Sequence, residues 1–550
     1  MIILQGQGVS KGIEYGTVYF YRRQRAAASP QTGHDVTEQR ARLERARAEA
    51  GEQLLQMAEL ARARAGDDAA ELFETHAMLL EDEDYTGVME RFIAGGHSAE
   101  YAAERAGEQF ERMLASMDDA YMRERATDIR DVTGRVLDLL GGVSREHPDW
   151  DSPVILAAHD LTPSETVQLD RNMVLAIATQ AGSTSSHTAI LARTMGIPAV
   201  CGLGERFNET YHGREAFIVG ETGELIFDPD PETLEALTER QKVQREQREL
   251  WRSMVGKEDV TLDGVKVEVC CNIGSPEDVS AVIANDAQGV GLFRSEFLYL
   301  AAGDYPGEEE QFRAYRQVAA AMEGKRVIIR TLDIGADKQV DYFGLEKEEN
   351  PAMGLRAIRI CLERPDVFRT QLRAIYRASA YGKVAIMFPM IANVWEVEEC
   401  LRICAEVREE LRQEGIEFDE HASLGIMLET PAAVLMADRL APLVDFFSMG
   451  TNDLTQYTLA CDRQCSGLGR FYDPHHPAVL RALKLAADAA HAAGIPVGIC
   501  GELAADSDML PVFLALGIDE LSVTPDAVLP LRAAIRSSTA KDCTLDLLDL

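Results

Sequence analysis

Two acidic side chains stand where apolar runs of the C-terminal half end, and together they could hold a metal ion. The apolar run 444–449 of the 550-residue chain leads directly into Gly450-Thr451-Asn452-Asp453, and the run 424–428 leads into Glu429. A carboxylate at the end of a buried strand is costly to desolvate unless something binds it. Carboxylate oxygens are the ligands that Mg²⁺ prefers in proteins. The pattern therefore predicts a divalent metal held by Glu429 and Asp453.

Arginines near these carboxylates could bind an anionic substrate. Arg294 and Arg330 each end an apolar run, and Arg463 follows the acidic motif by ten residues. Guanidinium groups form paired, charge-assisted hydrogen bonds with phosphate and carboxylate groups. Arg356 could hold a substrate carboxylate, or it could equally lie on a surface helix. Arginines beside metal-binding carboxylates predict a phosphorylated substrate.

The segment from residue 260 onward alternates eight times between apolar, strand-like runs and amphipathic helical stretches. Eight such units predict a (β/α)8 TIM barrel, whose catalytic groups lie at the C-terminal ends of the strands. The candidate residues all fall at that edge, which scattered core polar groups would not do. The strands are expected at residues 267–272, 289–294, 326–330, 384–389, 424–428, 444–449, 496–500 and 520–523.

Cys500 ends the seventh predicted strand and is a candidate proton donor. A buried thiol is usually inert packing, so only its place at the barrel mouth suggests a role. An ordinary thiol with a pKa of about 8.5 is about 97% protonated at pH 7, which is the form that an acid requires.

The N-terminal half predicts two further parts. Residues 1–30 carry glycines between alternating apolar residues and are expected to form strands. Helical spacing prevails at about 38–65, 70–80, 99–117 and 120–140, which predicts an antiparallel bundle. Strand-like runs return at 153–158, 172–178, 199–200 and 216–219.

The domain organisation follows from these changes of pattern. We expect an α/β domain made of residues 1–30 and 145–230, with the helical bundle 31–144 inserted into it. Residues 231–254 are polar all round, which favours a helix that connects domains. The linker is placed at 231–258 and the barrel at 259–550. The predicted fold class is therefore a multidomain α/β protein with a C-terminal TIM barrel.

His187 is a second candidate reactive residue. It follows Gly182-Ser183-Thr184-Ser185-Ser186 and precedes the helical stretch 188–195. Backbone amides at a helix start favour an anion. With a pKa of about 6.5 the imidazole would be mostly neutral at pH 7 and so nucleophilic. The same pattern is also that of an ordinary helix cap, so these residues alone do not decide its role.

Composition excludes some partners and compartments. A formal net charge of −36 disfavours nucleic acid and insertion into an anionic membrane, and it fits a basic protein partner better. Ten cysteines in 550 residues do not form a disulfide framework. We find neither a signal peptide nor an apolar run of membrane length. A soluble, cytoplasmic protein is expected.

The motif DFFSMGTNDLTQYTLACDR at residues 445–463 is highly specific for one family. The chain resembles Enzyme I of the bacterial phosphoenolpyruvate:sugar phosphotransferase system, and the resemblance covers nearly the whole chain. The motifs LTPSET at 161–166, GLFRSEF, RTLDIG, MFPMI and MLETPAA agree with that family in order and spacing.

The resemblance implies an activity and a set of partners. The phosphoryl group of phosphoenolpyruvate would pass to His187 with release of pyruvate, and then to a histidine of the small carrier HPr. The bundle would dock HPr, a mobile connector helix would let the histidine visit both sites, and the chain would form a homodimer through its barrel. The implied site residues are Glu429 and Asp453 for Mg²⁺; Arg294, Arg330, Asn452, Asp453 and Arg463 for phosphoenolpyruvate; Cys500 as the acid that protonates the enolate; and Thr166 and Arg193 in support of His187.

One departure from the family pattern bears on the histidine. The family usually carries Gly-Gly-Arg-Thr-Ser-His, whereas this chain has Gly182-Ser183-Thr184-Ser185-Ser186-His187. The arginine and the second glycine are absent, which leaves Arg193 as the candidate to compensate.

Two alternatives stay open from the sequence. A pyruvate phosphate dikinase or phosphoenolpyruvate synthase would share the barrel and the histidine domain, but it needs an ATP-grasp domain, and no such region precedes residue 145. A regulatory protein that binds phosphoenolpyruvate or HPr without turnover would have little need for Cys500 or the metal-binding carboxylates.

Overall fold

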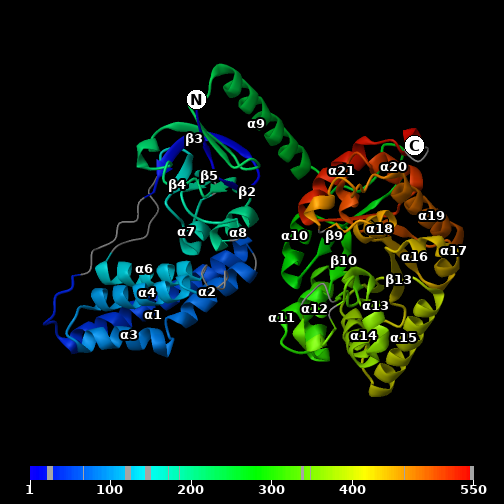
Figure 1. The fold of residues 1–550 in the computed structure, drawn as a ribbon, viewed down its shortest axis with the longest axis horizontal. Helices are drawn as coiled ribbons and strands as arrows, with labels where there is room; N and C mark the ends of the chain where they lie inside the picture. Colours follow the sequence, from blue (N-terminus) through cyan, green and yellow to red (C-terminus); the bar gives the residue numbers. More distant parts are fainter. Residues whose placement is uncertain are drawn as a thin grey trace. The chain divides into compact units, whose positions relative to one another are not determined.

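A computed structural model describes residues 1–21, 29–65, 67–117, 125–142, 150–170, 172–184, 186–335, 340–346, 348–463 and 465–545. The chain divides into two compact units, Met1–Arg248 and Glu249–Leu550 (Figure 1). Among the described helices, none is both long enough and apolar enough to cross a membrane.

The first unit contains a mixed eight-stranded sheet in the order β1-β8-β7-β3-β4-β5-β6-β2. The opening strands join those after residue 150, as predicted: β3 pairs in parallel with β4 and antiparallel with β7. Separate apolar clusters cover its two faces, which explains why its central strands are almost continuously apolar. The strands are β1 Ile2–Gln5, β2 Gln7–Ser10, β3 Ile13–Phe20, β4 Val154–Ala158, β5 Val174–Thr179, β6 Ala199–Cys201, β7 Glu215–Val219 and β8 Glu224–Phe227, with helices α7 Pro163–Val167 and α8 His187–Thr194.

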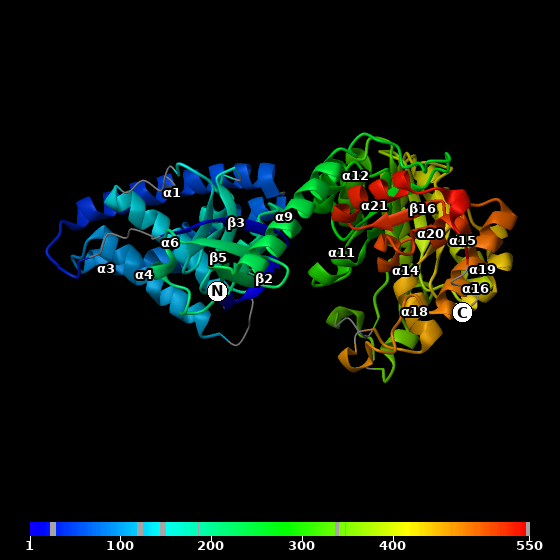
Figure 2. The same cartoon turned by 90° about the horizontal axis from the view of Figure 1, so that it is seen from above.

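The helical part of this unit is a bundle (Figure 2), and its helices pack around one large and one small apolar cluster. Its helices are α1 Val36–Ala65, α2 Asp67–Leu79, α3 Glu83–Ala94, α4 Ala99–Ala115 and α6 Ala126–Gly141. Side-chain caps start three of them: Asp35, Asp82 and Ser98 accept backbone hydrogen bonds at the starts of α1, α3 and α4. The sequence analysis did not predict α3.

Helix α9 (Pro231–Arg252) lies against the sheet of the first unit. Gln241 and Arg245 bind the carboxylate of Glu14 on β3, and Leu237 packs into an apolar cluster of the sheet. The predicted connector is therefore docked by polar side chains along most of its length. The first residue beyond it with a recorded contact to the barrel is Met254, whose carbonyl accepts from Arg532.

The second unit is a closed barrel of eight parallel strands, which confirms the predicted (β/α)8 fold. The observed strands lie within two residues of those predicted. They are β9 Glu268–Ile273, β10 Gly289–Arg294, β11 Arg326–Arg330, β12 Val384–Phe388, β13 Ser423–Leu428, β14 Phe446–Met449, β15 Val497–Ile499 and β16 Glu520–Val523.

Helices surround this barrel and bury the outer face of its strands in one large apolar cluster. A smaller cluster, including Leu292, Ile328, Met387, Met427 and Phe446, fills part of the lumen. The main helices are α10 Val279–Ala284, α11 Glu296–Ala301, α12 Glu308–Ala321, α13 Ile358–Glu363, α14 Pro365–Ser379, α15 Val394–Glu414, α16 Pro431–Leu435, α17 Ala437–Leu440, α18 Thr451–Leu459, α19 Pro477–Ala493, α20 Leu510–Leu516 and α21 Val528–Ser537.

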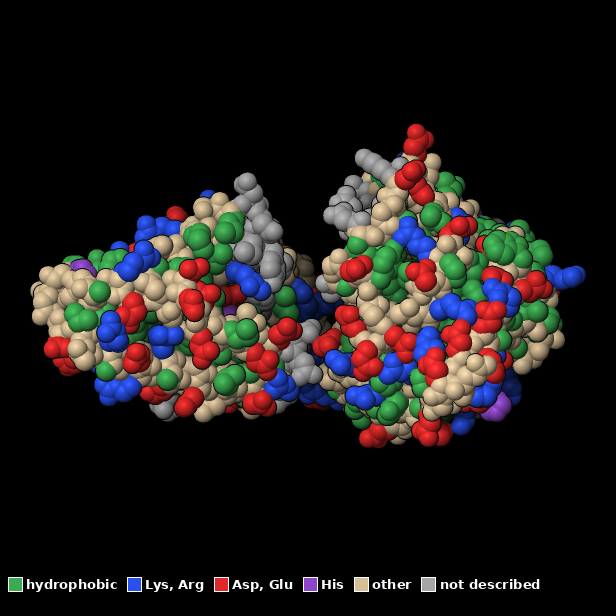
Figure 3. Space-filling view, turned by 90° about the horizontal axis from the view of Figure 1, so that it is seen from below, with side chains coloured by type: hydrophobic (Ala, Val, Ile, Leu, Met, Phe, Trp, Pro, Cys, Tyr) green, Lys and Arg blue, Asp and Glu red, His purple; other side chains and the backbone are tan. Residues whose placement is uncertain are grey.

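The strong negative charge is spread rather than gathered. On the face drawn in Figure 3, lysine and arginine side chains are interspersed with aspartate and glutamate over both units. The barrel helices show the reason, because arginines of α14 bridge to glutamates of α12 and α15, as Arg373 does to Glu308 and Glu414.

Candidate active site

A cavity of about 1050 Å³ opens at the C-terminal ends of the barrel strands. Every barrel residue to which the sequence assigned a metal-binding, substrate-binding or acid role lines it, so side chains that are up to 206 residues apart in the chain share one space. These are Arg294, Arg330, Arg356, Glu429, Asn452, Asp453, Arg463 and Cys500. Asn272, also expected at a strand end, instead binds the carbonyls of Cys500 and Ser522.

Glu429 is the most deeply buried acid of the cavity, with 1% of its surface exposed. It directly follows β13, and its Oε1 accepts a hydrogen bond of 2.5 Å from the backbone amide of Met390. A Cβ atom on Gly450 would lie 2.9 Å from Oε2, so the glycine leaves that oxygen open. Burial, followed by the charges of Asp333 and Asp453, raises the pKa of Glu429 to about 8.

These carboxylates fit a divalent cation. Asp453 lies in the first turn of α18 and is 8% exposed, with Arg463 Nη2 at 3.5 Å from its Oδ1. Because the nearby charge of Asp453 helps keep Glu429 protonated, a cation between them would relieve the repulsion and let Glu429 ionise. Hard oxygen donors of this kind suit Mg²⁺.

A different cluster has the geometry of a three-ligand metal site. Ligand atoms of Glu268, Cys270 and Glu520 lie within 4.8 Å of one another. This cluster lies at the N-terminal end of the barrel, away from the predicted site. Arg326 forms ion pairs with both glutamates and already supplies their counter-charge.

Buried arginines of the cavity retain donors for an anion. Arg330 is ion-paired to Glu296 and, at 3.0 Å, to Asp333. Asp333 also holds Arg356 at 3.1 Å. Within the described residues, Nε of both arginines is buried without a hydrogen-bond acceptor. These two N–H groups are unsatisfied until something that accepts hydrogen bonds enters the cavity.

Arg294 and Cys500 complete the chemistry of this space. Arg294 is exposed, and no ion pair or hydrogen bond of its side chain is recorded in the described part of the chain. Cys500 follows β15, and its Sγ–H donates to the carbonyl of Met449 at 3.7 Å. Burial raises the pKa of Cys500 to about 11, so the thiol is protonated at neutral pH, as a proton donor must be.

Asn452 is held by a two-way contact with the loop after β15. Its Nδ2 donates to Glu502 Oε1 at 3.1 Å, and its Oδ1 accepts from the Glu502 amide at 3.0 Å. The sequence analysis assigned no role to Glu296, Asp333 or Gly450, although all three lie within the quoted motifs. Their place in motifs that also contain predicted site residues was the one sequence feature that could have pointed to them.

His187 is the first residue of α8, in the first unit; its side chain lies outside the described atoms. Ser186 caps the helix by accepting from the Ala189 amide at 3.2 Å. Arg193 donates to the carbonyls of Val9 and Thr184, both at 3.1 Å, and so ties the loop before the histidine to β2. Thr166 is fully buried in α7, and its hydroxyl donates to Thr162 O at 2.9 Å.

Comparison with known families matches three stretches of the chain. Residues 248–540 match the family described as PEP-utilising enzyme, PEP-binding domain. Residues 5–125 match its N-terminal domain, and residues 150–223 match its mobile domain. The second and third matches lie on the bundle with the first strands, and on the segment that contains His187.

Curated relatives align over nearly the whole chain. The phosphoenolpyruvate-protein phosphotransferase of Priestia megaterium is 43% identical over 98% of this chain and 94% of its own length. That of Geobacillus stearothermophilus is 43% identical over 97% and 93%. That of Bacillus subtilis is 42% identical over 97% and 94%.

Proposed function

The chain belongs to the phosphoenolpyruvate-protein phosphotransferases, and from that premise we propose how its residues carry out the transfer. The phosphoryl group passes from phosphoenolpyruvate to His187, pyruvate leaves, and the phosphohistidine then phosphorylates the carrier HPr. The observation that carries the proposal is the barrel cavity, where unpaired arginine donors, two acids and a protonated thiol meet.

Substrate binding falls to the arginines. Arg294, Arg330 and Arg463 bind the phosphate and carboxylate oxygens, with Asn452 as an amide donor and Arg356 on the carboxylate side. Asp333 positions both Arg330 and Arg356: its Oδ2 is ion-paired to Arg330 and its Oδ1 to Arg356. The global charge of −36 would repel an anion, so this local positive charge is what makes binding possible.

Mg²⁺ held by Glu429 and Asp453 would neutralise phosphate charge and orient the substrate when bound. The phosphorus–oxygen bond breaks as a phosphorus–nitrogen bond forms with the imidazole of His187. The enolate that leaves takes the proton of Cys500 at its terminal carbon, which yields pyruvate and a thiolate.

The three parts of the chain are proposed to act in turn. The α/β domain carries the histidine, with Thr166 and Arg193 supporting its loop, the helical bundle docks HPr, and the barrel binds phosphoenolpyruvate. A hinge between Arg248 and Met254 would let the histidine visit both partners, because α9 is tied to the first unit up to Arg248 and to the barrel from Met254. Hinge closure of this kind is a common conformational change.

Two further properties complete the proposal. Leu435, Met436 and Leu485 are large apolar side chains exposed on the barrel, which supports a homodimer formed through this domain. Sedimentation velocity of the purified protein should show a dimer, and a monomer at micromolar concentration would contradict it.

All ten cysteines are free thiols, which supports a cytoplasmic location.

The first test is the intact mass of the protein after incubation with phosphoenolpyruvate and Mg²⁺ in the absence of ATP. We expect one acid-labile phosphoryl group, lost in His187→Ala and passed to added HPr. Incorporation at the wild-type level in His187→Ala would refute the assignment of that residue. Binding of phosphoenolpyruvate without any incorporation would favour a regulatory protein.

A second test addresses the acid. Cys500→Ser should slow pyruvate formation far more than it weakens binding of phosphoenolpyruvate, because the hydroxyl keeps the shape and is a much weaker acid. Single-turnover pyruvate formation and equilibrium binding separate the two effects. Unchanged turnover in the variant would remove Cys500 from the mechanism.

A further inference from the structure

The two sides of the barrel lumen differ in chemistry. One side is apolar and includes Leu292, Ile328, Met387, Met427 and Phe446. On the other side, strands β9, β15 and β16 place polar residues, a cysteine and a glycine toward the lumen. Their apolar residues face the outer cluster. The inward residues are Cys270, Asn272, Gly498, Glu520 and Ser522. Barrel lumens are normally filled by layers of bulky apolar side chains, so a polar side calls for a reason.

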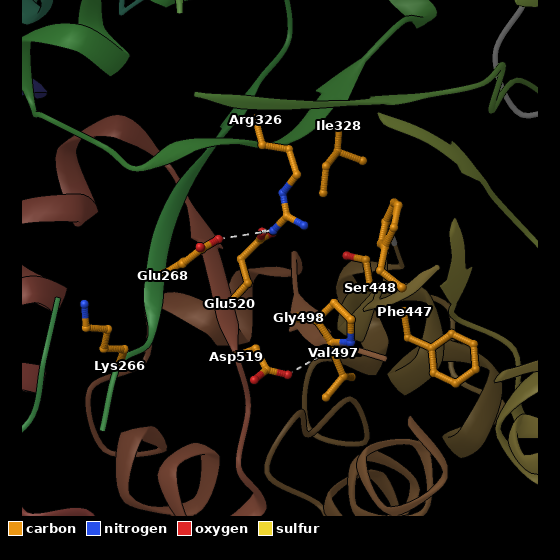
Figure 4. Close-up of a pocket in the computed structure, with 12 residues that line it drawn as sticks. Lys266, Glu268, Arg326, Ile328, Phe447, Ser448, Val497, Gly498, Asp519 and Glu520 are labelled. Carbon is orange, nitrogen blue, oxygen red and sulfur yellow. Dashed lines mark hydrogen bonds and ion pairs between the residues drawn. The ribbon is translucent and has the colours of Figure 1, made fainter. Parts of the chain in front are cut away.

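A second cavity, of about 340 Å³, opens at the N-terminal end of this polar side. Figure 4 shows Arg326 and Glu520 meeting in it, with Glu268 paired to the same guanidinium nitrogen, Nη2. Glu520 is 5% exposed, whereas the side chains of Lys266 and Glu268 reach solvent. A space of this size, lined by charged groups, can hold water.

This lower cavity ends close to Cys500. Gly498 lines the lower cavity and Cys500 lines the upper one, two residues further along the same face of β15. Two residues of a strand span about 7 Å. A Cβ on Gly498 would lie 3.5 Å from Glu520 Oε1, so the missing side chain opens the space beside that carboxylate.

Ser448 stands between the two cavities. It pairs with Gly498 in the sheet and lines the lower cavity, and in Figure 4 its hydroxyl points toward the space beside Glu520. The residue is 2% exposed, and its Oγ has no hydrogen bond of regular geometry within the described residues. It also lies close enough to the Cys500 thiol to lower its pKa, against the larger effect of burial. A buried hydroxyl that lies beside the Cys500 thiol and lines the lower cavity is placed to pass a proton between them.

The proposed reaction creates a need at this point. After it has protonated the enolate, Cys500 is a buried thiolate, and burial makes that charge unfavourable. The upper cavity then holds pyruvate, which blocks solvent from that side. A proton source beneath the thiolate would restore the acid without waiting for the product to leave.

We propose that the polar side of the lumen returns protons to Cys500 from the lower cavity, with Glu520 as the reservoir and Ser448 as the relay. This inference rests on the proposed role of Cys500. The Ser448 hydroxyl gives its proton to the thiolate sulfur and takes one from water in the lower cavity, which takes one from the Glu520 carboxyl. The carboxylate regains its proton from solvent at the mouth beside Lys266 and Glu268, so the net result is that one proton moves from solvent to Cys500 and neutralises the thiolate.

The Glu520 carboxyl is suited to this role. Burial raises the pKa of this carboxyl and so favours its protonated form, against the opposing charge of Arg326. A purely structural ion pair with Arg326, closing the bottom of the barrel, is the competing explanation. That role would affect stability alone, whereas a relay affects each turnover after the first.

The test is rapid-quench measurement of pyruvate with excess phosphoenolpyruvate, Mg²⁺ and HPr, on the full chain. The unsubstituted protein should form pyruvate without a burst. Ser448→Ala and Glu520→Gln should form the first pyruvate per site at the normal rate, because the thiol starts protonated, and later ones roughly tenfold or more slowly. Ser379→Ala, which changes a buried serine on α14 outside the lumen, is the matched control.

The outcomes separate the two levels of the inference. Equal rates for all turnovers in both variants would overturn the relay, and so would a uniform slowing of every turnover, which indicates misplacement of the thiol. If Glu520→Gln does not fold, Ser448→Ala decides, since its hydroxyl holds no regular hydrogen bond. A normal first turnover in Cys500→Ser would instead remove Cys500 from the mechanism, and the relay with it.

Discussion

Two buried arginines of the barrel, Arg532 and Arg330, are used in opposite ways. Arg532 on α21 is fully buried, and each of its three nitrogens has an acceptor: Nε binds Asp259, Nη1 binds Asp286 and the Met254 carbonyl, and Nη2 binds the Asp286 carbonyl. Arg330 at the barrel mouth has two carboxylate partners but keeps a buried Nε without one, among the described residues.

The difference distinguishes structural charge from functional charge. A guanidinium with every donor satisfied by its own chain has nothing to offer a ligand, and removing it leaves carboxylates without a counter-charge. A guanidinium with a donor left over is incomplete until an acceptor arrives. Arg356 and the exposed Arg294 fall into the second group, and all three line one cavity. Burial alone would not have separated Arg330 and Arg356 from Arg532.

The largest expected effect tests the structural side. Arg532→Met should lower the free energy of unfolding by about 3–5 kcal/mol, because Asp259 is left buried without its counter-charge. Urea unfolding measures the change. The matched control is Arg536→Met on the same helix, where a half-buried side chain binds a single carbonyl and the loss should be within about 1 kcal/mol. Equal losses in the two variants would contradict the comparison.

The functional side predicts the reverse pattern. Arg294→Met should reduce pyruvate formation by roughly 10²–10³-fold, the usual cost of removing one donor to a developing charge, with stability unchanged within about 0.5 kcal/mol. Arg439→Met, an exposed arginine of α17, should change neither quantity. Single-turnover kinetics and urea unfolding on the same samples give both readouts. A stability loss equal to that of Arg532→Met would place Arg294 in the structural group.

The sequence predicted the barrel well because its signal is local. Apolar runs such as RVIIR at 326–330 end where the chain must turn, and each observed strand lies within two residues of its predicted position. The cavity residues followed from the rule that such ends meet at one edge. Helix α3 was not predicted, because its apolar residues are interrupted by Gly87 and preceded by a run of acids.

What the sequence could not predict depends on contacts between distant residues. Asp333 binds both Arg330 and Arg356, and it contacts Arg356, which lies 23 residues after it, only because the loop after β11 returns to the barrel mouth. The docking of α9 was hidden for a related reason. Its contacts with Glu14 use long polar side chains, which leave no apolar stripe in the sequence.

The smallest expected effect, taken per pH unit, concerns the carboxylates, where the same contrast applies. Without metal, the pKa of Glu429 is raised to about 8 by burial and neighbouring acids, above the value of about 4.3 in an unfolded chain. Between these values the folded state binds more protons than the unfolded state, so stability should fall as the pH rises, by at most about 1.4 kcal/mol per pH unit. Below about pH 4 both states are protonated and the effect vanishes.

Mg²⁺ and one substitution sharpen this prediction. Urea unfolding of the metal-free protein should show that the free energy of unfolding falls as the pH rises from 5 to 8. This pH dependence should disappear in Glu429→Gln, because its side chain cannot ionise. Glu396→Gln, at a buried glutamate whose carboxylate is already satisfied by backbone amides at the start of α15, should keep it. Saturating Mg²⁺ should also remove it, because a cation lets Glu429 ionise in the folded state. If the pH dependence is the same in Glu429→Gln, the acids of the mouth are satisfied as fully as Asp259 is, and the distinction between the two groups fails for carboxylates.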